Sequence, residues 1–254
     1  MKQAKYPLPL LALLALLPLL PLSIPSAGAD PDTTRPTPPV GLIQARVFRN
    51  LRLQDFKLDG VLHTKKNIYP MVMRTRNQEM VFAFKEQPLQ IRVVLDPDHA
   101  VVARRKADAD AWQPVTGKAM KETILDTDIT YEDLGMGFIF WDRVNSIGCD
   151  SIKTLPAWCL EATPPDGVTS AYAKVRYWIS SQYCAFLRVD GYNAKGEVVK
   201  RVEVNGITQI ADAYVIKEMA VSTMIPGREL SASRTFIEIR DGAPGSGLAG
   251  ASGL

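Results

Sequence analysis

The segment from Tyr69 to Leu95 reads YPMVMRTRNQEMVFAFKEQPLQIRVVL, and it decides the fold class. Apolar residues stand at every second position in two sets: Tyr69, Met71, Met73, and Met80, Phe82, Phe84. A period of two places each set on one face of a β-strand. Gln87-Pro88 is typical of a turn between strands. The segment therefore predicts successive antiparallel strands with one apolar face.

Strand-like segments of the same kind recur along most of the chain. Besides Tyr69–Thr75, Glu79–Phe84 and Leu89–Leu95, we expect strands at Phe56–His63, Ala100–Arg104, Ala157–Ala162, Ala173–Ser180, Ala185–Tyr192, Val198–Ile210, Ala213–Thr223 and Ser233–Ile239. Asn193-Ala194-Lys195-Gly196 is typical of a hairpin turn, because Gly196 can adopt positive φ. Long helices do not alternate with these strands, which argues against a parallel α/β sheet. We predict a mainly β fold with few helices, built on a large antiparallel sheet.

Two segments are typical of helices. Thr130-Tyr131-Glu132-Asp133 begins with a threonine that can cap a helix, and Asp133 can reach back to it in a variant of the capping box. A second helix is expected at Val40–Asn50. Both helices are short, so we expect them to lie over the sheet rather than to form a separate layer.

The helix that begins near Thr130 has an apolar stripe but weak intrinsic preference. Leu134, Phe138 and Trp141 stand at i, i+4 and i+7, which places them on one helix face. Gly135 and Gly137 each cost about 1 kcal/mol relative to alanine in a helix interior. The sequence therefore predicts a helix that depends on a partner surface.

The first 29 residues have the three-part layout of a secretory signal peptide. Lys2 and Lys5 precede the apolar run Leu8–Leu22, and the small residues Ser26-Ala27-Gly28-Ala29 follow it. We expect cleavage between Ala29 and Asp30 and export from the cytoplasm. The alternative is an uncleaved anchor, but the run contains prolines and is shorter than the about twenty residues that a membrane span needs. We do not expect an integral membrane protein after cleavage.

The ends of the mature chain differ in composition from its middle. Residues 30–40 contain four prolines, which is typical of a flexible leader, and Asp241–Leu254 consists mainly of Gly, Ala, Ser and Pro, which is typical of a disordered tail. One folded domain is expected at residues 41–240. The formal charge of +3 becomes +1 once Lys2 and Lys5 are removed, so the composition does not support nucleic-acid binding.

Three cysteines, Cys149, Cys159 and Cys184, lie in the mature part. An oxidising compartment permits one disulfide and leaves one thiol. We favour Cys149 with Cys159, because a hairpin centred on Thr154 would place them face to face. The alternative, of at least equal weight, is three buried thiols that pack as small apolar groups.

Motifs for catalysis or metal binding are missing from the sequence. There is no GxSxG, HExxH, phosphate-binding glycine loop or dinucleotide fingerprint. His63 and His99 fit no ligand pattern with the cysteines. Glu132 and Asp133 do not form a carboxylate pair, because adjacent residues on a helix point about 100° apart. We predict no catalytic residue, no metal site, no cofactor and no enzymatic activity.

Four stretches of the chain form an ordered set: TDITYEDL at Thr127–Leu134, Lys153–Pro164, YAKVRYWI at Tyr172–Ile179, and Phe186–Val204 with its turn at Gly196. In order and spacing, this set resembles a divergent branch of the LolA-like outer-membrane lipoprotein-sorting proteins. Where that family has a cysteine opening the strand after the hairpin turn, this chain has Ala157, and Cys159 stands two positions on. We assign no residue to the arginine that latches the helical lid in the lipoprotein carriers.

The resemblance implies both a fold and a role. The fold is an incomplete, strongly curved antiparallel barrel whose concave side is covered by helices and encloses an apolar cavity. The role is a periplasmic carrier that binds acyl chains of lipoproteins or lipids and aids their sorting to the outer membrane. Envelope proteins that donate and accept the cargo would be its protein partners.

Candidate residues for the lining of such a cavity are adaptable apolar side chains on the predicted sheet and on the helix near Thr130. They are Met71, Met73, Phe82, Phe84, Ile91, Val93, Phe138 and Trp141. For any one of these residues, ordinary core packing is the simpler explanation, because every half-buried sheet needs an alternating apolar face. The carrier hypothesis therefore requires a hollow beneath Tyr131–Trp141 that these side chains leave unfilled.

Two other functions remain open at this point. The same fold could present its surface to an envelope partner as an interaction or sensor module, in which case its interior should be packed shut. A thiol or hydrolytic enzyme would depend on the three cysteines.

Overall fold

The structure is a computed structural model that describes residues 37–50, 53–96, 99–210 and 213–245. The predicted signal peptide, most of the leader and the last nine residues of the predicted tail lie outside these ranges. None of the helices in the described ranges is long and apolar enough to cross a membrane.

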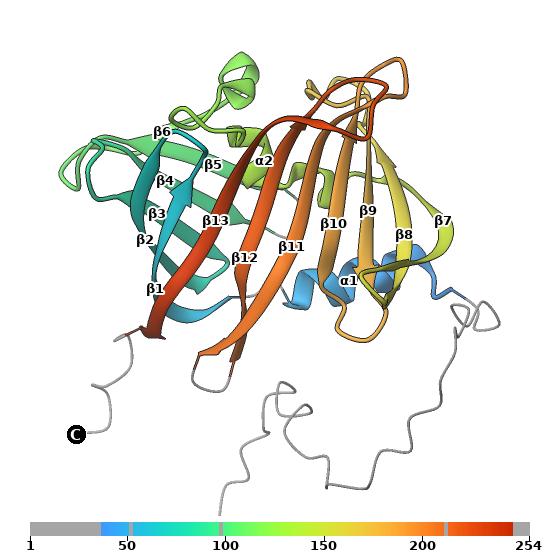
Figure 1. Cartoon of the computed structure of the whole chain (residues 1–254), viewed down its shortest axis with the longest axis horizontal. Coiled ribbons are helices and arrows are strands. Elements are labelled where there is room, and N and C mark those ends of the chain that lie inside the picture. Colours follow the sequence, from blue (N-terminus) through green and yellow to red (C-terminus); the bar gives the residue numbers. More distant parts are fainter. Residues whose placement is uncertain (1–36, 51–52, 97–98, 211–212, 246–254) are drawn as a thin grey trace, which may run out of the picture.

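The described residues form one antiparallel sheet of thirteen strands (Figure 1). The first six strands are β1 (Leu53–His63), β2 (Ile68–Asn77), β3 (Glu79–Phe84), β4 (Gln90–Leu95), β5 (Ala100–Arg105) and β6 (Gln113–Pro114). The remaining seven are β7 (Arg143–Ile152), β8 (Leu155–Thr163), β9 (Lys174–Ser180), β10 (Phe186–Tyr192), β11 (Val198–Ile210), β12 (Ala213–Met224) and β13 (Ser231–Pro244). Strands that follow one another in the chain are neighbours within each group.

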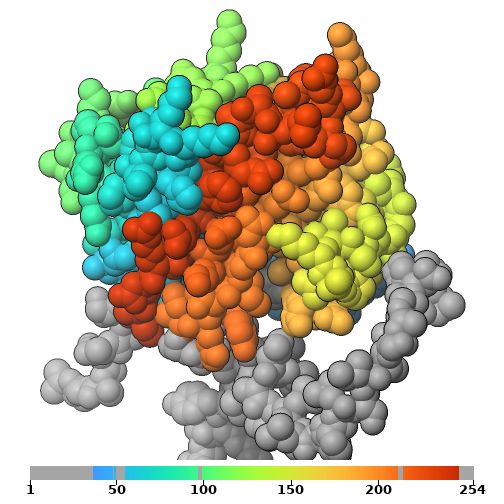
Figure 2. Space-filling model, viewed as in Figure 1, coloured from blue at the N-terminus to red at the C-terminus, as the bar shows by residue number. Residues whose placement is uncertain are grey.

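The two groups of strands are joined by one pair, β1 with β13. The sheet order is β6-β5-β4-β3-β2-β1-β13-β12-β11-β10-β9-β8-β7, so β6 and β7 are its edges and the sheet does not close into a barrel. It curves strongly, with its helices on the concave side (Figure 1). On the convex side, the side chains of β1, β13, β12 and β11 form a continuous surface (Figure 2). The predicted fold class, a mainly β curved and incomplete barrel, is confirmed.

Four helical segments lie on the concave side. Helix α1 is Val40–Asn50, the range expected from the sequence. The connection between β6 and β7 contains the 3₁₀ helix η1 (Gly117–Lys121), helix α2 (Tyr131–Gly135) and the 3₁₀ helix η2 (Gly137–Phe140). The capping box at the start of α2 is formed: Asp133 N donates to Thr130 Oγ1 (3.2 Å), and Thr130 N donates to Asp133 Oδ2 (2.9 Å).

The helix that begins after Thr130 is shorter than we expected from the apolar stripe of Leu134, Phe138 and Trp141. It ends at Gly135, because Met136 adopts a left-handed conformation (φ 46°), and a 3₁₀ turn follows. Leu134 therefore packs against one apolar cluster, whereas Phe138 and Trp141 pack in another. The predicted single stripe is wrong because the chain changes direction at Met136.

The apolar core of the concave side is divided into two clusters. The first apolar cluster lies between β1–β5 and the α2 segment; its buried members are Phe56, Leu58, Leu62, Met71, Phe82, Phe84, Ile91, Val93, Leu95, Val102, Val115, Ile124, Ile129, Tyr131, Val221 and Ile239. The second apolar cluster lies between β8–β10 and α1; its buried members are Ile43, Val47, Trp141, Trp158, Leu160, Ala162, Val175, Tyr177 and Ile179. A smaller outer cluster of Ala157, Cys159, Trp178 and Leu187 lies on the opposite face of the same strands.

One predicted boundary needs correction, and two strands, β6 and β7, were not predicted. Strand β13 continues to Pro244, so residues 241–244, expected in a disordered tail, belong to the sheet. Strand β7 was not predicted, because its polar and small residues (RVNSIGCDSI) are largely exposed and lack an apolar alternation.

Candidate functional site

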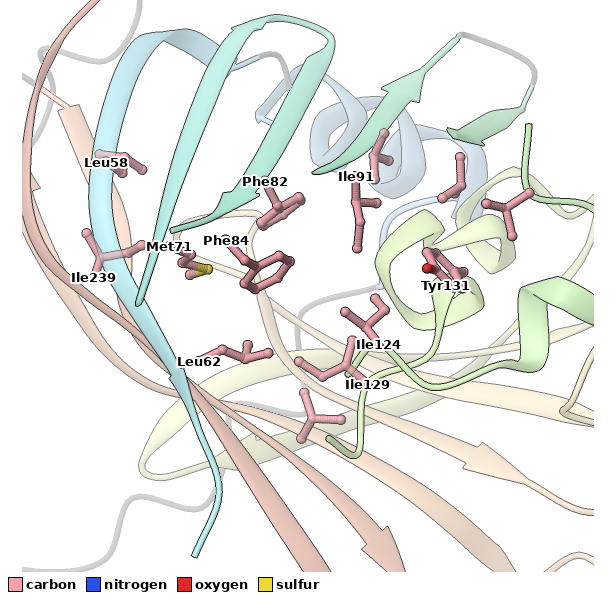
Figure 3. Packing of buried hydrophobic residues seen from close by; sticks show 14 of the residues in the cluster. Leu58, Leu62, Met71, Phe82, Phe84, Ile91, Ile124, Ile129, Tyr131 and Ile239 are labelled. Atoms are coloured by element: carbon pink, nitrogen blue, oxygen red, sulfur yellow. The ribbon is translucent and has the colours of Figure 1, made fainter. Parts of the chain in front are cut away.

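The eight predicted lining residues do not lie at one site. Met71, Phe82, Phe84, Ile91 and Val93 are buried in the first apolar cluster, and Met73 packs against it. Phe138 and Trp141 belong to the second apolar cluster. The connection between β6 and β7, which contains α2, lies over the concave face and is the covering segment. Figure 3 shows Met71, Phe82 and Phe84 directed toward Ile124, Ile129 and Tyr131 of this segment.

The covering segment is fixed to the sheet by Asp128, which is buried. Its Oδ1 accepts hydrogen bonds from Thr223 Oγ1 (2.6 Å) and from Ser233 Oγ, and its Oδ2 accepts one from Thr235 Oγ1 (2.9 Å). Lys200 Nζ donates to the carbonyl oxygen of Asp128. Hydrogen bonds to a charged acceptor are worth more than neutral ones, so this carboxylate holds the segment firmly against β12 and β13.

Two more carboxylates, those of Glu132 and Asp133, attach α2 to residues 170–172. Glu132 accepts hydrogen bonds from Ser170 Oγ and from Ala171 N (2.9 Å to Oε2). Asp133 accepts one from Tyr172 Oη (2.5 Å), and Lys200 Nζ lies 3.5 Å from its Oδ2. Burial and the neighbouring Asp133 carboxylate raise the pKa of Tyr172, so its hydroxyl remains a neutral donor. The acidic residues of TDITYEDL therefore anchor the segment to the rest of the fold.

Helix α1 is held in a different way. Ile43 and Val47 of α1 are buried in the second apolar cluster. The one side-chain hydrogen bond recorded from the described residues of α1 is long, from Gln44 Nε2 to the carbonyl oxygen of Ile139 (3.4 Å). Apolar contact therefore provides most of the attachment of α1, whereas three carboxylates attach α2.

Two small cavities lie among the described residues of the concave side. One, of about 20 Å³, lies beneath α1 and is lined by Ile43, Gln44, Val47, Ile139, Leu160, Tyr177 and Phe186. The other, of about 10 Å³, lies in the first apolar cluster and is lined by Leu62, Met71, Phe82, Phe84, Ile124, Ile129, Leu134 and Ile237. A cavity of about 10–15 Å³ on this measure holds one water molecule. Neither cavity has room for an acyl chain.

The hollow expected beneath Tyr131–Trp141 is therefore not present in this conformation. Ile124, Ile129 and Leu134 of the covering segment fill the space over the first apolar cluster. Phe138 and Trp141 occupy the corresponding space over the second apolar cluster. The sequence could not indicate this filling, because it follows from where the covering segment crosses the sheet.

None of the residues that line the larger cavity was among the eight predicted ones, and Tyr177 is the member of this lining with an unpartnered buried hydroxyl. It lies on β9, opposite Leu160 of β8 and Val189 of β10, and it is 2% exposed. Its ring packs against those of Phe138 and Phe186, with centroids 5.4 and 5.9 Å away. No described residue forms a hydrogen bond with its hydroxyl, and burial raises its pKa. The alternation Val175, Tyr177, Ile179 was the available signal.

None of the three cysteines, all of which lie in the described ranges, forms a disulfide in the structure. The β7–β8 turn is centred between Lys153 and Thr154, which both have positive φ (49° and 73°), so Cys149 lies opposite Trp158 and Cys159 opposite Gly148. Adjacent positions of a strand face opposite sides of a sheet, so the favoured pairing of Cys149 with Cys159 is not made. Cys149 is exposed and Cys159 is buried in the outer cluster, so the alternative of three buried thiols does not hold either.

In the described ranges, no set of three or more His, Cys, Asp and Glu side chains is arranged to bind a metal ion. His63 stacks on Phe236 with ring centroids 5.1 Å apart, and His99 is exposed, with Nδ1 3.9 Å from the Asp96 carboxylate.

A protein-family model with the description "-like: Uncharacterized protein" matches residues 108–248 of the chain. No curated protein matches the sequence. Solved structures match over most of its length. A DUF1329 family protein from Desulfovibrio piger is 14% identical, with a TM-score of 0.63, and the match covers 84% of this chain and 96% of that chain.

Two further solved structures are similar. A domain from Vibrio parahaemolyticus assigned to outer membrane lipoprotein sorting is 15% identical, with a TM-score of 0.66 and coverage of 82% of this chain and 93% of that chain. A LolA superfamily protein from Nitrosomonas europaea is 12% identical, with a TM-score of 0.56 and coverage of 80% and 92%. At these identities the likeness is one of fold, and the resemblance stated from the sequence is confirmed at that level.

Proposed function

The chain belongs to the protein family whose model matches residues 108–248, and on its LolA-like fold we propose a periplasmic carrier of acyl chains. The carrier is not an enzyme. It binds acyl chains of lipoproteins or lipids beneath α1 and aids their sorting to the outer membrane, receiving them from and passing them to envelope proteins. The three-part layout of residues 1–29 supports the export step.

The observation that carries this proposal is that α1 and the α2 segment, which both lie over the concave face, are attached to the sheet in different ways. Three carboxylates fix the α2 segment, whereas α1 covers the second apolar cluster mainly through apolar contact and has a small cavity beneath it. Elements with few hydrogen bonds to the rest of a fold open at lower free energy than anchored ones. The site therefore opens by movement of α1 away from β8–β10.

The free energies involved are compatible with such opening. An acyl chain of about twelve carbons gains about 10 kcal/mol on burial, at about 0.8 kcal/mol per methylene. Exposure of the side chains of Ile43 and Val47 costs about 1.5–3 kcal/mol each. The apolar side chains of the sheet beneath α1 stay covered, because the ligand takes the place of the helix. The gain from burial of the acyl chain therefore exceeds the cost of exposing these two side chains.

Fluorescence titration of the chain without residues 1–29 tests the proposal, with cis-parinaric acid methyl ester as the probe. Leu160→Phe places a bulkier side chain in the floor of the site, and we expect at least fivefold weaker binding. Leu187→Phe makes the same change on β10, in the outer cluster on the opposite face, and should leave binding within twofold of the original. No binding by the original chain, or equal losses in both variants, would overturn the proposal.

An envelope interaction module is the second candidate, and the filled concave face favours it. In that case α1 stays in place, the probe does not bind, and chemical cross-linking in the native envelope yields one protein partner. Extraction of lipid from protein purified gently from its native host separates the two candidates, since only a carrier retains bound acyl chains.

A further inference from the structure

Tyr177 differs from the other buried polar side chains of the described residues, because its hydroxyl is the one without a hydrogen-bond partner. Tyr172, which packs against the same cluster, donates its hydroxyl to Asp133. Tyr177 also lines the cavity beneath α1, so the unpartnered hydroxyl belongs to a residue of the proposed site. A buried donor without an acceptor is unfavourable, so a ligand that supplies an acceptor here is stabilised.

The charges around the second apolar cluster restrict which acceptor this can be. Arg46 and Arg49 of α1 are exposed, whereas Ile43 and Val47 are buried. Lys174 and Arg176 lie on the other face of β9 and both pair with Glu161.

Arg143, at the start of β7, pairs with Asp166. Tyr172, which packs against the second apolar cluster, donates to the Asp133 carboxylate and also lies in the field of Glu132, and both negative charges would repel an anion. A buried carboxylate without a cation is strongly disfavoured. The acceptor that fits is therefore neutral.

We propose that Tyr177 Oη donates a hydrogen bond to the carbonyl oxygen of an esterified or amide-linked acyl chain. This inference rests on the proposed function and narrows its ligand class to neutral acyl esters and amides, as opposed to free fatty acids. Tyr177 is thus the polar anchor of the site, and the rings of Phe138 and Phe186 hold its hydroxyl in position. The chain thus recognises the carbonyl of the ligand by a hydrogen bond and the rest of the acyl chain by apolar contact.

Three probes with different head groups test the inference by titration against the original chain and Tyr177→Phe. Diphenylhexatriene has no polar atom, cis-parinaric acid methyl ester has a neutral carbonyl, and cis-parinaric acid is an anion at neutral pH. We expect Tyr177→Phe to bind the methyl ester about fivefold more weakly and diphenylhexatriene with unchanged affinity. The original chain should bind the ester more tightly than the acid at pH 8. Tyr214→Phe, an exposed position on β12, is the matched control and should change neither affinity.

The outcomes separate the inference from the proposed function. If no probe binds, the carrier proposal itself fails. If all probes bind and Tyr177→Phe weakens none of them, or weakens diphenylhexatriene as much as the ester, the carrier proposal stands and the role of Tyr177 is refuted. Displacement of the ester by a synthetic lipopeptide, compared with displacement by phosphatidylglycerol, distinguishes lipoprotein from phospholipid as the source of the acyl carbonyl.

Discussion

Asp128 accepts hydrogen bonds from Thr223, Ser233 and Thr235, which lie on β12 and β13. Asp128→Ala leaves these hydroxyl groups without their acceptor, so we expect it to lower the free energy of unfolding by about 3 kcal/mol. Urea unfolding monitored by tryptophan fluorescence measures this. Asp126→Ala, at an exposed position two residues earlier, should change stability by less than about 0.5 kcal/mol. Equal effects would show that Asp128 does not anchor the segment.

The cysteines should differ in reactivity according to their burial. Cys149 is exposed, whereas burial raises the pKa of the Cys159 thiol to about 12, so almost no thiolate forms there at pH 8. We expect N-ethylmaleimide to modify Cys149 in the native protein and Cys159 only after unfolding, as measured by peptide mass spectrometry. Cys149→Ser should remove the fast reaction. Recovery of a Cys149–Cys159 disulfide from exported protein would contradict the hairpin register.

At the residue scale, sequence reasoning identified contacts that are local in the chain. The capping box of Thr130 and Asp133 spans three residues, and its pattern alone predicts it. The role of Asp128 depends on hydroxyls about a hundred residues away along the chain, so no local pattern could reveal it. The unpartnered hydroxyl of Tyr177 is a property of packing, and the sequence shows only an aromatic residue in a strand.

Helix α1 should open more readily than the α2 segment. Apolar contact holds α1, and carboxylates hold α2, so amide hydrogens of α1 should exchange through local opening of lower free energy. Hydrogen exchange with mass spectrometry should show at least tenfold faster exchange in peptides from residues 40–50 than in peptides from residues 122–135. Bound cis-parinaric acid methyl ester should change protection in the first set alone. Equal protection in both sets would argue against α1 as the moving cover.

At the element scale, the alternation of apolar residues predicted eleven of the strands to within a few residues. That signal exists because one face of each such strand is buried. Strand β7 lies at an edge and is mostly exposed, so its sequence carries no alternation to detect. The helix at Thr130 was predicted too long, because the heptad-like spacing of Leu134, Phe138 and Trp141 arises from two separate packing surfaces.

The pairing of β1 with β13 joins the two halves of the sheet, and at Gly60 the two backbones approach each other closely. A Cβ at Gly60 would lie 2.5 Å from the carbonyl oxygen of Glu238. Gly60→Ala should therefore force the two strands apart and destabilise the whole molecule by about 2–3 kcal/mol, in a single unfolding transition. Gly41→Ala in α1 meets no atom within 4 Å and should be neutral or stabilising by about 0.5 kcal/mol. Thermal unfolding by circular dichroism compares the two variants.

The strand order also determines when the sheet can be completed during biogenesis. A polypeptide is made and translocated from its amino end, yet the neighbour of β1 is the last described strand, β13. Until β13 emerges, the meander of β1–β6 has an unpaired, apolar edge that can associate with other nascent chains. Completion of the sheet is therefore a late event, and the half-emerged chain is the stage at which a holding chaperone has most to protect.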